Sequence, residues 1–184
     1  MPITVRRAAV EDARAIALVR IRTWQSAYRG LIADALLDQM DVEENTQVWR
    51  ERLSTWSEER ALFVAEIDAG EGAHPGSRVV GFCACGPERE ADPAYPAEIY
   101  ALYVLSAFHR HGAGRLLVQA AASWLQERGY AHLLIYVLRD NKNARRFYEA
   151  VGGTFVREVI RDVAGHAMVE VGYGYVISRL RALE

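Results

Sequence analysis

The stretch His109-Arg-His-Gly-Ala-Gly-Arg115 follows the apolar run Ile99–Leu105 and opens a segment whose apolar residues recur at helical spacing, namely Leu117, Ala120, Ala121, Trp124 and Leu125. An apolar strand, a Gly-x-Gly turn and an amphipathic helix in this order aim backbone N–H groups at the space before the helix, where an anion can bind. The glycines leave room for phosphate oxygens because they lack a Cβ atom. The stretch therefore predicts a phosphate-bearing ligand at residues 110–115.

The same Gly pair also fits a tight turn that binds nothing, and the pattern alone leaves both interpretations open. It does exclude two better-known phosphate loops. No Gly-Lys-Ser/Thr sequence ends the turn, as a P-loop would require. Leu117 stands where the third glycine of a dinucleotide-binding Gly-x-Gly-x-x-Gly motif would be.

Length and composition indicate one globular domain over residues 1–184. The chain is 51% hydrophobic and 25% charged, and its net charge of −2 gives no general attraction to nucleic acid or anionic membranes. No apolar run approaches the ~20 residues that span a bilayer, and Met1–Arg7 has no apolar signal region. We therefore expect a cytoplasmic protein with neither a nucleic acid nor a membrane partner.

The two cysteines, Cys83 and Cys85, lie two residues apart in a strand-like run, so they share one face of the strand. Zinc sites usually require four ligands at recognisable spacings, and the sequence contains no such set. We expect no metal and interpret both thiols as small apolar residues within a sheet.

Hydrophobic periodicity and turn residues predict strands alternating with helices. The expected strands are Ile3–Arg7, Ala61–Asp68, Val79–Cys85, Ile99–Leu105, His132–Leu138, Thr154–Val163 and Ala167–Ile177. The expected helices are Asp12–Tyr28, Ala33–Met40, Glu43–Trp56, Gly112–Arg128 and Asn141–Val151. A long loop at Ala69–Ser77 joins one hairpin, and a turn at Ala164-Gly165 joins the last. This order favours an α/β (mixed α+β) fold with a central mixed sheet flanked by helices.

Two motifs carry a resemblance to a known family. His109-Arg110-His111-Gly112-Ala113-Gly114 resembles the Gln/Arg-x-x-Gly-x-Gly/Ala motif of the GCN5-related N-acetyltransferase superfamily, with His109 replacing the usual Gln or Arg. Asn141-Lys-Asn-Ala-Arg-Arg-Phe-Tyr-Glu-Ala-Val-Gly152 is similar throughout to a second motif, Asn-x-x-Ala-x-x-Phe-Tyr-x-x-x-Gly. The two have the usual separation, with one helix and one strand between them. The segment Trp24–Gly30 resembles one branch of bacterial members.

The resemblance implies an acyl-CoA N-acyltransferase fold, with a mostly antiparallel sheet and a splayed strand pair that admits acetyl-CoA. The cofactor core would span about residues 97–153. The helices of about residues 12–56 and the hairpin of about 154–177 would shape the acceptor cleft. The implied activity is direct transfer of an acetyl group to a primary amine of a small molecule or peptide. The alternative is a catalytically silent acyl-CoA-binding module that regulates a partner.

By the same resemblance, the cofactor contacts fall on three segments. Backbone groups of Leu102, Tyr103 and Val104 would bind the pantetheine arm and the acetyl carbonyl. The pyrophosphate would lie against Arg110, His111, Gly112, Ala113, Gly114 and Arg115. Asn141, Ala144 and Tyr148 would complete the site from the next helix. Arg110 and Arg115 could equally be solvated surface charges.

The resemblance also assigns Tyr148 as the acid that protonates the leaving thiolate, because a phenol with a pKa of ~10 can return a proton as the C–S bond breaks. A packing role beside Phe147 is the alternative. Glu98 is the candidate base, acting through water, although a charged residue at a strand start is also ordinary surface. His132, His166 and Glu170 are further candidates, and a water chain could replace a dedicated base.

The acceptor is expected to lie among aromatic side chains. Trp24 and Tyr28 would hold an ammonium group by cation–π attraction or would simply pack on the sheet. Tyr100, on the same side as Glu98, and Tyr136, on the neighbouring strand, are further substrate-binding candidates. The acidic segment of residues 88–98 would steer a cation or form a solvated loop. An apolar edge segment at Val169–Val176 suggests a homodimer.

Overall fold

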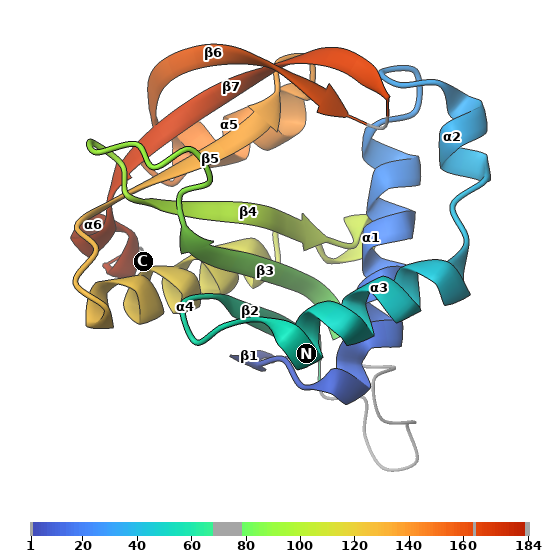
Figure 1. Ribbon diagram of the computed structural model, residues 1–184, viewed down its shortest axis with the longest axis horizontal. Helices are drawn as coiled ribbons and strands as arrows, with labels where there is room; N and C mark the ends of the chain where they lie inside the picture. Colours follow the sequence, from blue (N-terminus) through green and yellow to red (C-terminus); the bar gives the residue numbers. More distant parts are fainter. Residues whose placement is uncertain (1, 68–78, 164, 183–184) are drawn as a thin grey trace.

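In the computed structural model, which describes residues 2–67, 79–163 and 165–182, all strands join one seven-stranded sheet (Figure 1). The strand order is β1-β2-β3-β4-β5-β7-β6. β4 and β5 are parallel, and every other neighbouring pair is antiparallel. This confirms the predicted mixed, mostly antiparallel sheet. The strands are β1 (Ile3–Arg7), β2 (Ala61–Ile67), β3 (Val79–Pro87), β4 (Ala97–Val104), β5 (His132–Leu138), β6 (Thr154–Val163) and β7 (His166–Val176).

The helices follow the predicted ranges to within a few residues: α1 (Ala13–Ala27), α2 (Asp34–Asp38), α3 (Val42–Thr55), α4 (Ala113–Glu127) and α5 (Lys142–Ala150). A further helix, α6 (Ile177–Arg181), begins where a strand end was predicted. The predicted loop at 69–77 and Ala164 of the last turn lie outside the described residues. Within the described part of the chain, no helix has both the length and the hydropathy to cross a bilayer.

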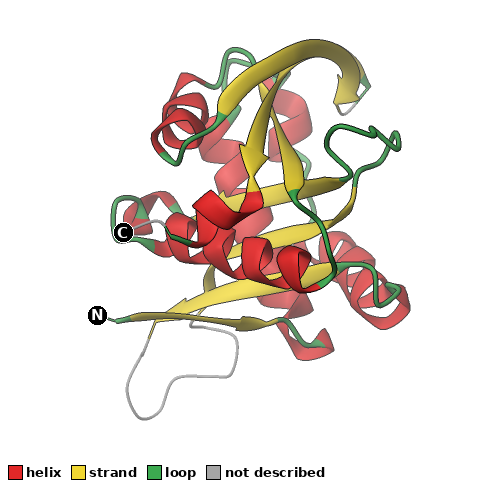
Figure 2. Cartoon of the chain, turned by 90° about the vertical axis from the view of Figure 1, so that its left-hand side faces the viewer, coloured by secondary structure: helices red, strands yellow, loops and turns green. Residues whose placement is uncertain are grey.

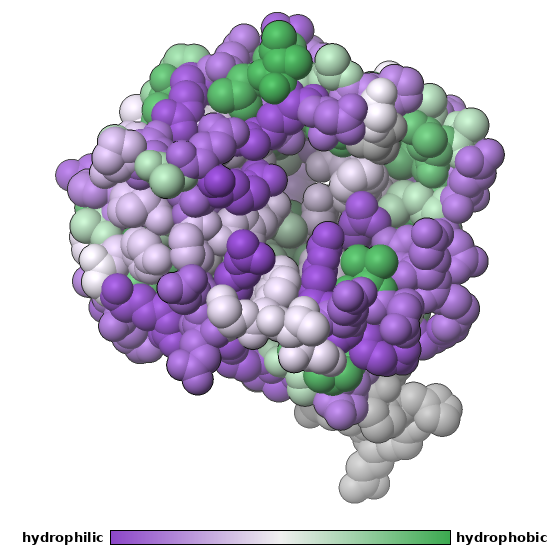
Figure 3. Space-filling model, in the orientation of Figure 1, coloured by the Kyte–Doolittle hydropathy of each residue, from purple (hydrophilic) through white to green (hydrophobic). Residues whose placement is uncertain are grey.

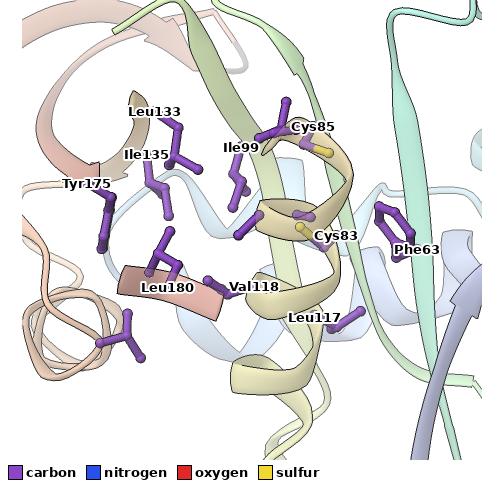
Figure 4. Packing of buried hydrophobic residues seen from close by; sticks show 14 of the residues in the cluster. Phe63, Cys83, Cys85, Ile99, Leu117, Val118, Leu133, Ile135, Tyr175 and Leu180 are labelled. Carbon is purple, nitrogen blue, oxygen red and sulfur yellow. The ribbon is translucent and has the colours of Figure 1, made fainter. Parts of the chain in front are cut away.

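Helices cover both faces of the sheet (Figure 2). On one face, α4, α5 and α6 enclose a large apolar cluster that includes both cysteines (Figure 4). On the other face, α1 and α3 pack around Phe82, which is fully buried. Cys83 and Cys85 therefore share one face, as their spacing predicts, and act as apolar core residues.

The outer edge of the sheet beyond β5 is formed by β6, not by β7. β7 pairs with β5 on one side and with β6 on the other, so the prediction of an exposed edge at Val169–Val176 was wrong. The apolar and aromatic character of this segment reflects its burial between two strands. The homodimer that we inferred from it loses this support and stays a prediction.

β4 and β5 separate after a short contact. They pair only at Ala97–Ile99 with Leu133–Ile135. Tyr100 is an extra residue in β4, because Ala101 pairs with Ala84 and Ile99 pairs with Cys85. Such a bulge bends and twists a strand. Among the described residues, the edge of β4 that faces β5 is therefore left without a strand partner over residues 100–104. Figure 3 shows the molecule hollowed over this wedge, and the splayed pair predicted for the fold is present.

Candidate active site

The loop between β4 and α4 offers a set of unpaired backbone donors. Within the described residues, no group accepts a hydrogen bond from the N–H groups of residues 110–115, and the first such bond runs from Leu116 to the Gly112 carbonyl at 3.0 Å. Gly112 precedes the helix with φ of +87°, a left-handed conformation that glycine adopts without strain. Free N–H groups at a helix N-terminus attract an anion, and this arrangement suits a diphosphate.

Two histidines and a close helix contact hold this loop. His109 Nε2 lies 2.8 Å from the Val104 carbonyl oxygen, and His111 Nδ1 lies 2.8 Å from the His109 carbonyl oxygen. His109, the departure from the family motif, thus fastens the loop to the end of β4. A Cβ atom on Gly114 would lie 3.1 Å from the Phe147 ring. Gly114 therefore permits α4 and α5 to approach each other.

The charges around the loop are positive. Arg110 and Arg115 are exposed, and within the described part of the chain neither forms an ion pair with a carboxylate. Guanidinium groups that have no carboxylate partner are available for charge-assisted hydrogen bonds to phosphate.

Tyr148 lies on α5 with an exposed fraction of 6%. Its ring packs edge-on against Phe147, with 5.6 Å between centroids. Burial raises the pKa of the Tyr148 phenol well above its usual value, with smaller contributions from Tyr103 and Cys83. The hydroxyl therefore keeps its proton at neutral pH, as a general acid must.

Asn141 has a structural function in addition to any contact with a ligand. It is the N-cap of α5, and its Oδ1 accepts a hydrogen bond from the Ala144 N–H at 3.1 Å. A cap of this kind satisfies one of the free donors at the start of a helix. This hydrogen bond gives a structural reason for an asparagine at position 141, and it fixes the start of the helix that carries Tyr148.

Glu98 is fully buried and paired. Its exposed fraction is 0%, and Arg89 donates to it through Nε at 3.0 Å and through a second, shorter hydrogen bond from Nη2. The hydrogen bonds to Glu98 raise the pKa of Arg89 against the opposing effect of burial. A carboxylate held by a guanidinium in this way is poorly placed to take a proton from water.

The other acids of the segment of residues 88–98 also have partners. Glu88 accepts hydrogen bonds from the N–H groups of Glu90 and Asp92, at 2.8 and 2.9 Å. Asp92 forms an ion pair with Arg157 at 2.5 Å. Both carboxylates therefore shape the loop, but only Asp92 is neutralised by a cation, since Glu88 is held by backbone N–H groups and its Oε1 has no hydrogen-bond partner among the described residues.

Tyr100 and Tyr136 both use their hydroxyl groups within the protein. Tyr100 donates to the Pro87 carbonyl oxygen, and burial raises its pKa to about 12. The Tyr136 hydroxyl accepts hydrogen bonds from Arg157 Nε and Nη2 at 2.9 and 2.8 Å. Tyr100 packs against the core cluster on the α1 side of the sheet, and Arg161 lies over the Tyr136 ring, 4.6 Å from its centroid.

Trp24, Tyr28 and Tyr103 lie together beside Tyr148. Trp24 and Tyr28 pack edge to face, with 5.1 Å between ring centroids. Burial raises the pKa of Tyr28, and the hydroxyls of Tyr103 and Tyr148 reinforce this effect. Trp24 Nε1 is buried and forms no hydrogen bond of normal geometry with any described residue. The structure thus brings predicted residues from α1, β4 and α5 into one polar aromatic cluster.

Glu170, on β7, faces this cluster. Its side chain is 16% exposed and forms an ion pair with Arg161 at 3.3 Å. Burial raises the pKa of the Glu170 carboxyl against the opposing charges of Arg161 and Arg89. Glu170 in turn raises the pKa of Tyr28 and Tyr103. The other two base candidates, His132 and His166, are exposed, so Glu170 is the best placed of the further candidates.

Comparison with known proteins defines the class. Residues 10–153 match the model of the acetyltransferase (GNAT) family. The chain is 31% identical over 182 residues, 98% of each chain, to the uncharacterized N-acetyltransferase YuaI of Bacillus subtilis. The chain therefore belongs to the GNAT family, whose acetyl donor is acetyl-CoA.

Solved structures share the fold. PaiA N-acetyltransferase of Thermoplasma acidophilum, in complex with coenzyme A, has a TM-score of 0.64 at 18% identity and covers 93% of this chain and 98% of its own. YncA of Salmonella typhimurium, solved with its cofactor acetyl-CoA, has a TM-score of 0.63 at 18% identity and covers 95% of this chain and 94% of its own. The free N–H groups of residues 110–115 and the open edge of β4 fit the diphosphate and the amide-bearing arm of such a cofactor.

Proposed function

We propose that this protein is an N-acetyltransferase domain, spanning residues 1–184, that moves an acetyl group from acetyl-CoA directly to a primary amine of a small molecule or peptide. One observation carries the proposal. A wedge between β4 and β5 has free backbone donors at one end, and a buried tyrosine with a raised pKa lies beside it.

The cofactor would lie along the wedge. The backbone N–H groups of residues 110–115 would bind the diphosphate, with Arg110 and Arg115 adding charge. The open β4 edge at Leu102, Tyr103 and Val104 would pair with the amide groups of the pantetheine arm. A backbone N–H on this edge can also donate to an oxygen atom that gains negative charge during the transfer. Asn141 and Ala144 would border the arm from α5.

Acetyl-CoA supplies an activated thioester. Tyr148 holds a proton at its phenol oxygen and can donate it to the departing sulfur. The acceptor ammonium must first lose a proton to a base. Glu170 suits this role better than Glu98, because burial has raised its pKa and Arg161 contacts its Oε2 at 3.3 Å without a hydrogen bond of normal geometry, whereas two hydrogen bonds from Arg89 hold Glu98. A water chain remains the alternative to either carboxylate.

Replacement of Tyr148 by phenylalanine tests the proposal. Y148F keeps the ring and loses the proton, so we expect kcat to fall by about 100-fold or more while CoA affinity changes less than about twofold. Release of free CoA against a panel of amines measures the rate, and calorimetry measures the affinity. Y175F is the control, because Tyr175 donates a hydrogen bond to the Tyr148 carbonyl oxygen at 3.0 Å and supports only the fold.

The same assays separate the enzyme from the silent binding module. A silent module would bind CoA through the backbone N–H groups of residues 110–115 and would release no free CoA from acetyl-CoA with any amine. Turnover by Y148F equal to that of the parent would instead exclude Tyr148 as the acid.

A further inference from the structure

Arg20, on α1, is a partly buried cation without an acidic partner. Its guanidinium lies over the Trp24 ring, 4.3 Å from the centroid, and Nη1 donates to Asn45 Oδ1 at 2.5 Å. Within the described residues it forms no ion pair. Burial lowers its pKa, and the nearby Arg52 acts in the same direction. Such a charge is costly to bury unless an anion eventually meets it.

Arg20 lines a cavity of about 500 Å³ between α1, α2 and α3, the helices on the right of Figure 1. The cavity lining is mixed: the apolar side chains include Ile32, Leu36, Leu37 and Val48, and six of the thirteen lining residues are polar or charged. Arg20 and Arg52 line the cavity as well. A pocket that combines apolar side chains with converging polar groups can take a small molecule that carries both kinds of group.

Two acids, Asp41 and Glu44, also line this cavity, and neither neutralises Arg20 through an ion pair. Asp41 has a structural function, since its Oδ1 accepts the Glu44 N–H at 2.8 Å as the N-cap of α3. The guanidinium therefore remains available to an incoming anion.

The cavity adjoins the aromatic cluster of the active site. Trp24 is common to both, and the charge of Arg20 influences the hydroxyls of Tyr28 and Tyr103. Ile32 borders a second cavity of about 500 Å³ that reaches the β6–β7 hairpin at 166–168. Glu170 lines neither of these cavities, but Arg20 and Glu170 both influence the Tyr103 hydroxyl, so the two charges lie near the same tyrosine.

We propose that Arg20 binds an anionic oxygen group of the acceptor, so that the substrates are amines that also carry a carboxylate or phosphonate, as amino acids do. The inference rests on the proposed N-acetyltransferase function and names the substrate class of that site. The apolar side chains of the cavity take the hydrocarbon part of the acceptor. The guanidinium fixes one end of the molecule and leaves the amine free to face the acetyl group.

Matched acceptors test the inference by CoA release. Each set compares an amino acid, the aminophosphonate of the same skeleton and the amine that lacks the acid group. We expect the parent to favour an acidic member by at least tenfold in kcat/KM, and R20Q to abolish that preference through KM. The two acidic members distinguish carboxylate from phosphonate. R20K should restore part of the preference, and R22Q, at an exposed position on the same helix, should retain all of it.

Binding gives a second readout that does not require turnover. Products of such a reaction keep the acid group, so N-acetyl amino acids and N-acetyl aminophosphonates should bind the parent in the presence of CoA and bind R20Q at least tenfold more weakly. Equal use of acidic and neutral amines by parent and R20Q would overturn the inference and leave the transferase intact. Failure of all N-acetylated acids to bind the CoA complex would overturn it as well. Failure of the parent protein to bind CoA would instead refute the proposed function.

Discussion

Replacement of Gly112 by alanine separates ligand binding from folding. The φ of +87° places an L-residue in the left-handed region, which costs about 1–2 kcal/mol. For a chain of this length the cost corresponds to a fall in Tm of about 2–8 °C. No atom of the described residues lies within 4 Å of the new Cβ, so the substitution creates no clash with them. The methyl group would instead enter the space in which we propose that the diphosphate meets the backbone.

Calorimetric titration of CoA into G112A should show at least tenfold weaker binding, or about 1.4 kcal/mol. The matched control is G129A, because Gly129 has φ of +85°, no atom within 4 Å of a Cβ, and a position just beyond the other end of α4. Both variants should lose similar stability, and only G112A should lose affinity. If both bind CoA like the parent, the diphosphate site does not lie at residues 110–115. If both lose affinity equally, destabilisation explains the loss.

Three further outcomes are expected. The double variant R110Q/R115Q should bind CoA more weakly than the parent. Its affinity for CoA should also depend less on salt in titrations from low to high ionic strength, because salt screens contacts between arginine and phosphate. An unchanged dependence on salt would show that both arginines are only surface charges. Burial raises the pKa of Tyr100 to about 12, so the unfolded chain loses the phenol proton at a lower pH than the folded protein does. The free energy of unfolding should therefore fall as pH rises from about 10 to 12. Denaturant melts of Y100F over this range should show a shallower fall. Hydrogen bonds from Arg6 and the Ala9 N–H outweigh burial and lower the pKa of Asp12. The stability that ionised Asp12 contributes is therefore complete above its unfolded pKa near 3.8 and is lost as pH falls below that value. D12N should lower the free energy of unfolding by about 2 kcal/mol at neutral pH and should weaken the dependence of stability on acid pH in denaturant melts.

The backbone geometry of the loop between β4 and α4 was predictable because it depends on local sequence. A Gly-x-Gly turn before an amphipathic helix specifies free backbone donors wherever it folds, so the loop geometry at residues 110–115 follows from neighbours in the chain. The order of helices and strands was predictable for the same reason. The end of β7 was not, because Val176 and Ile177 are β-branched and favour a strand, whereas Ile177 and Leu180 in fact turn inward and are buried in the core cluster beside α4.

Side-chain partners across loops could not be read from the sequence. Glu98 looked like a free carboxylate at a strand start, and only the path of the preceding loop brings Arg89 onto it. The bulge at Tyr100 depends on the register between β3 and β4, which no local pattern specifies. Arg20 was one charge among many on an amphipathic helix, and its lack of an acidic partner becomes visible only when α2 and α3 are packed beside it.

The burial of Cys83 and Cys85 makes these thiols reporters of the folded state. Both side chains lie under α4 with exposed fractions of 0%, and burial raises the pKa of Cys85 to about 12. Alkylating and disulfide reagents need an accessible thiolate, so they should react with these residues only when α4 separates from the sheet by local or global unfolding. Reagents that trap the sulfur of released CoA would then count turnovers without background from the intact protein. The rate at which the protein's own thiols react would then measure the rate at which the core opens. Thiol-specific oxidants that inactivate enzymes with exposed cysteines should leave the activity of this protein unchanged.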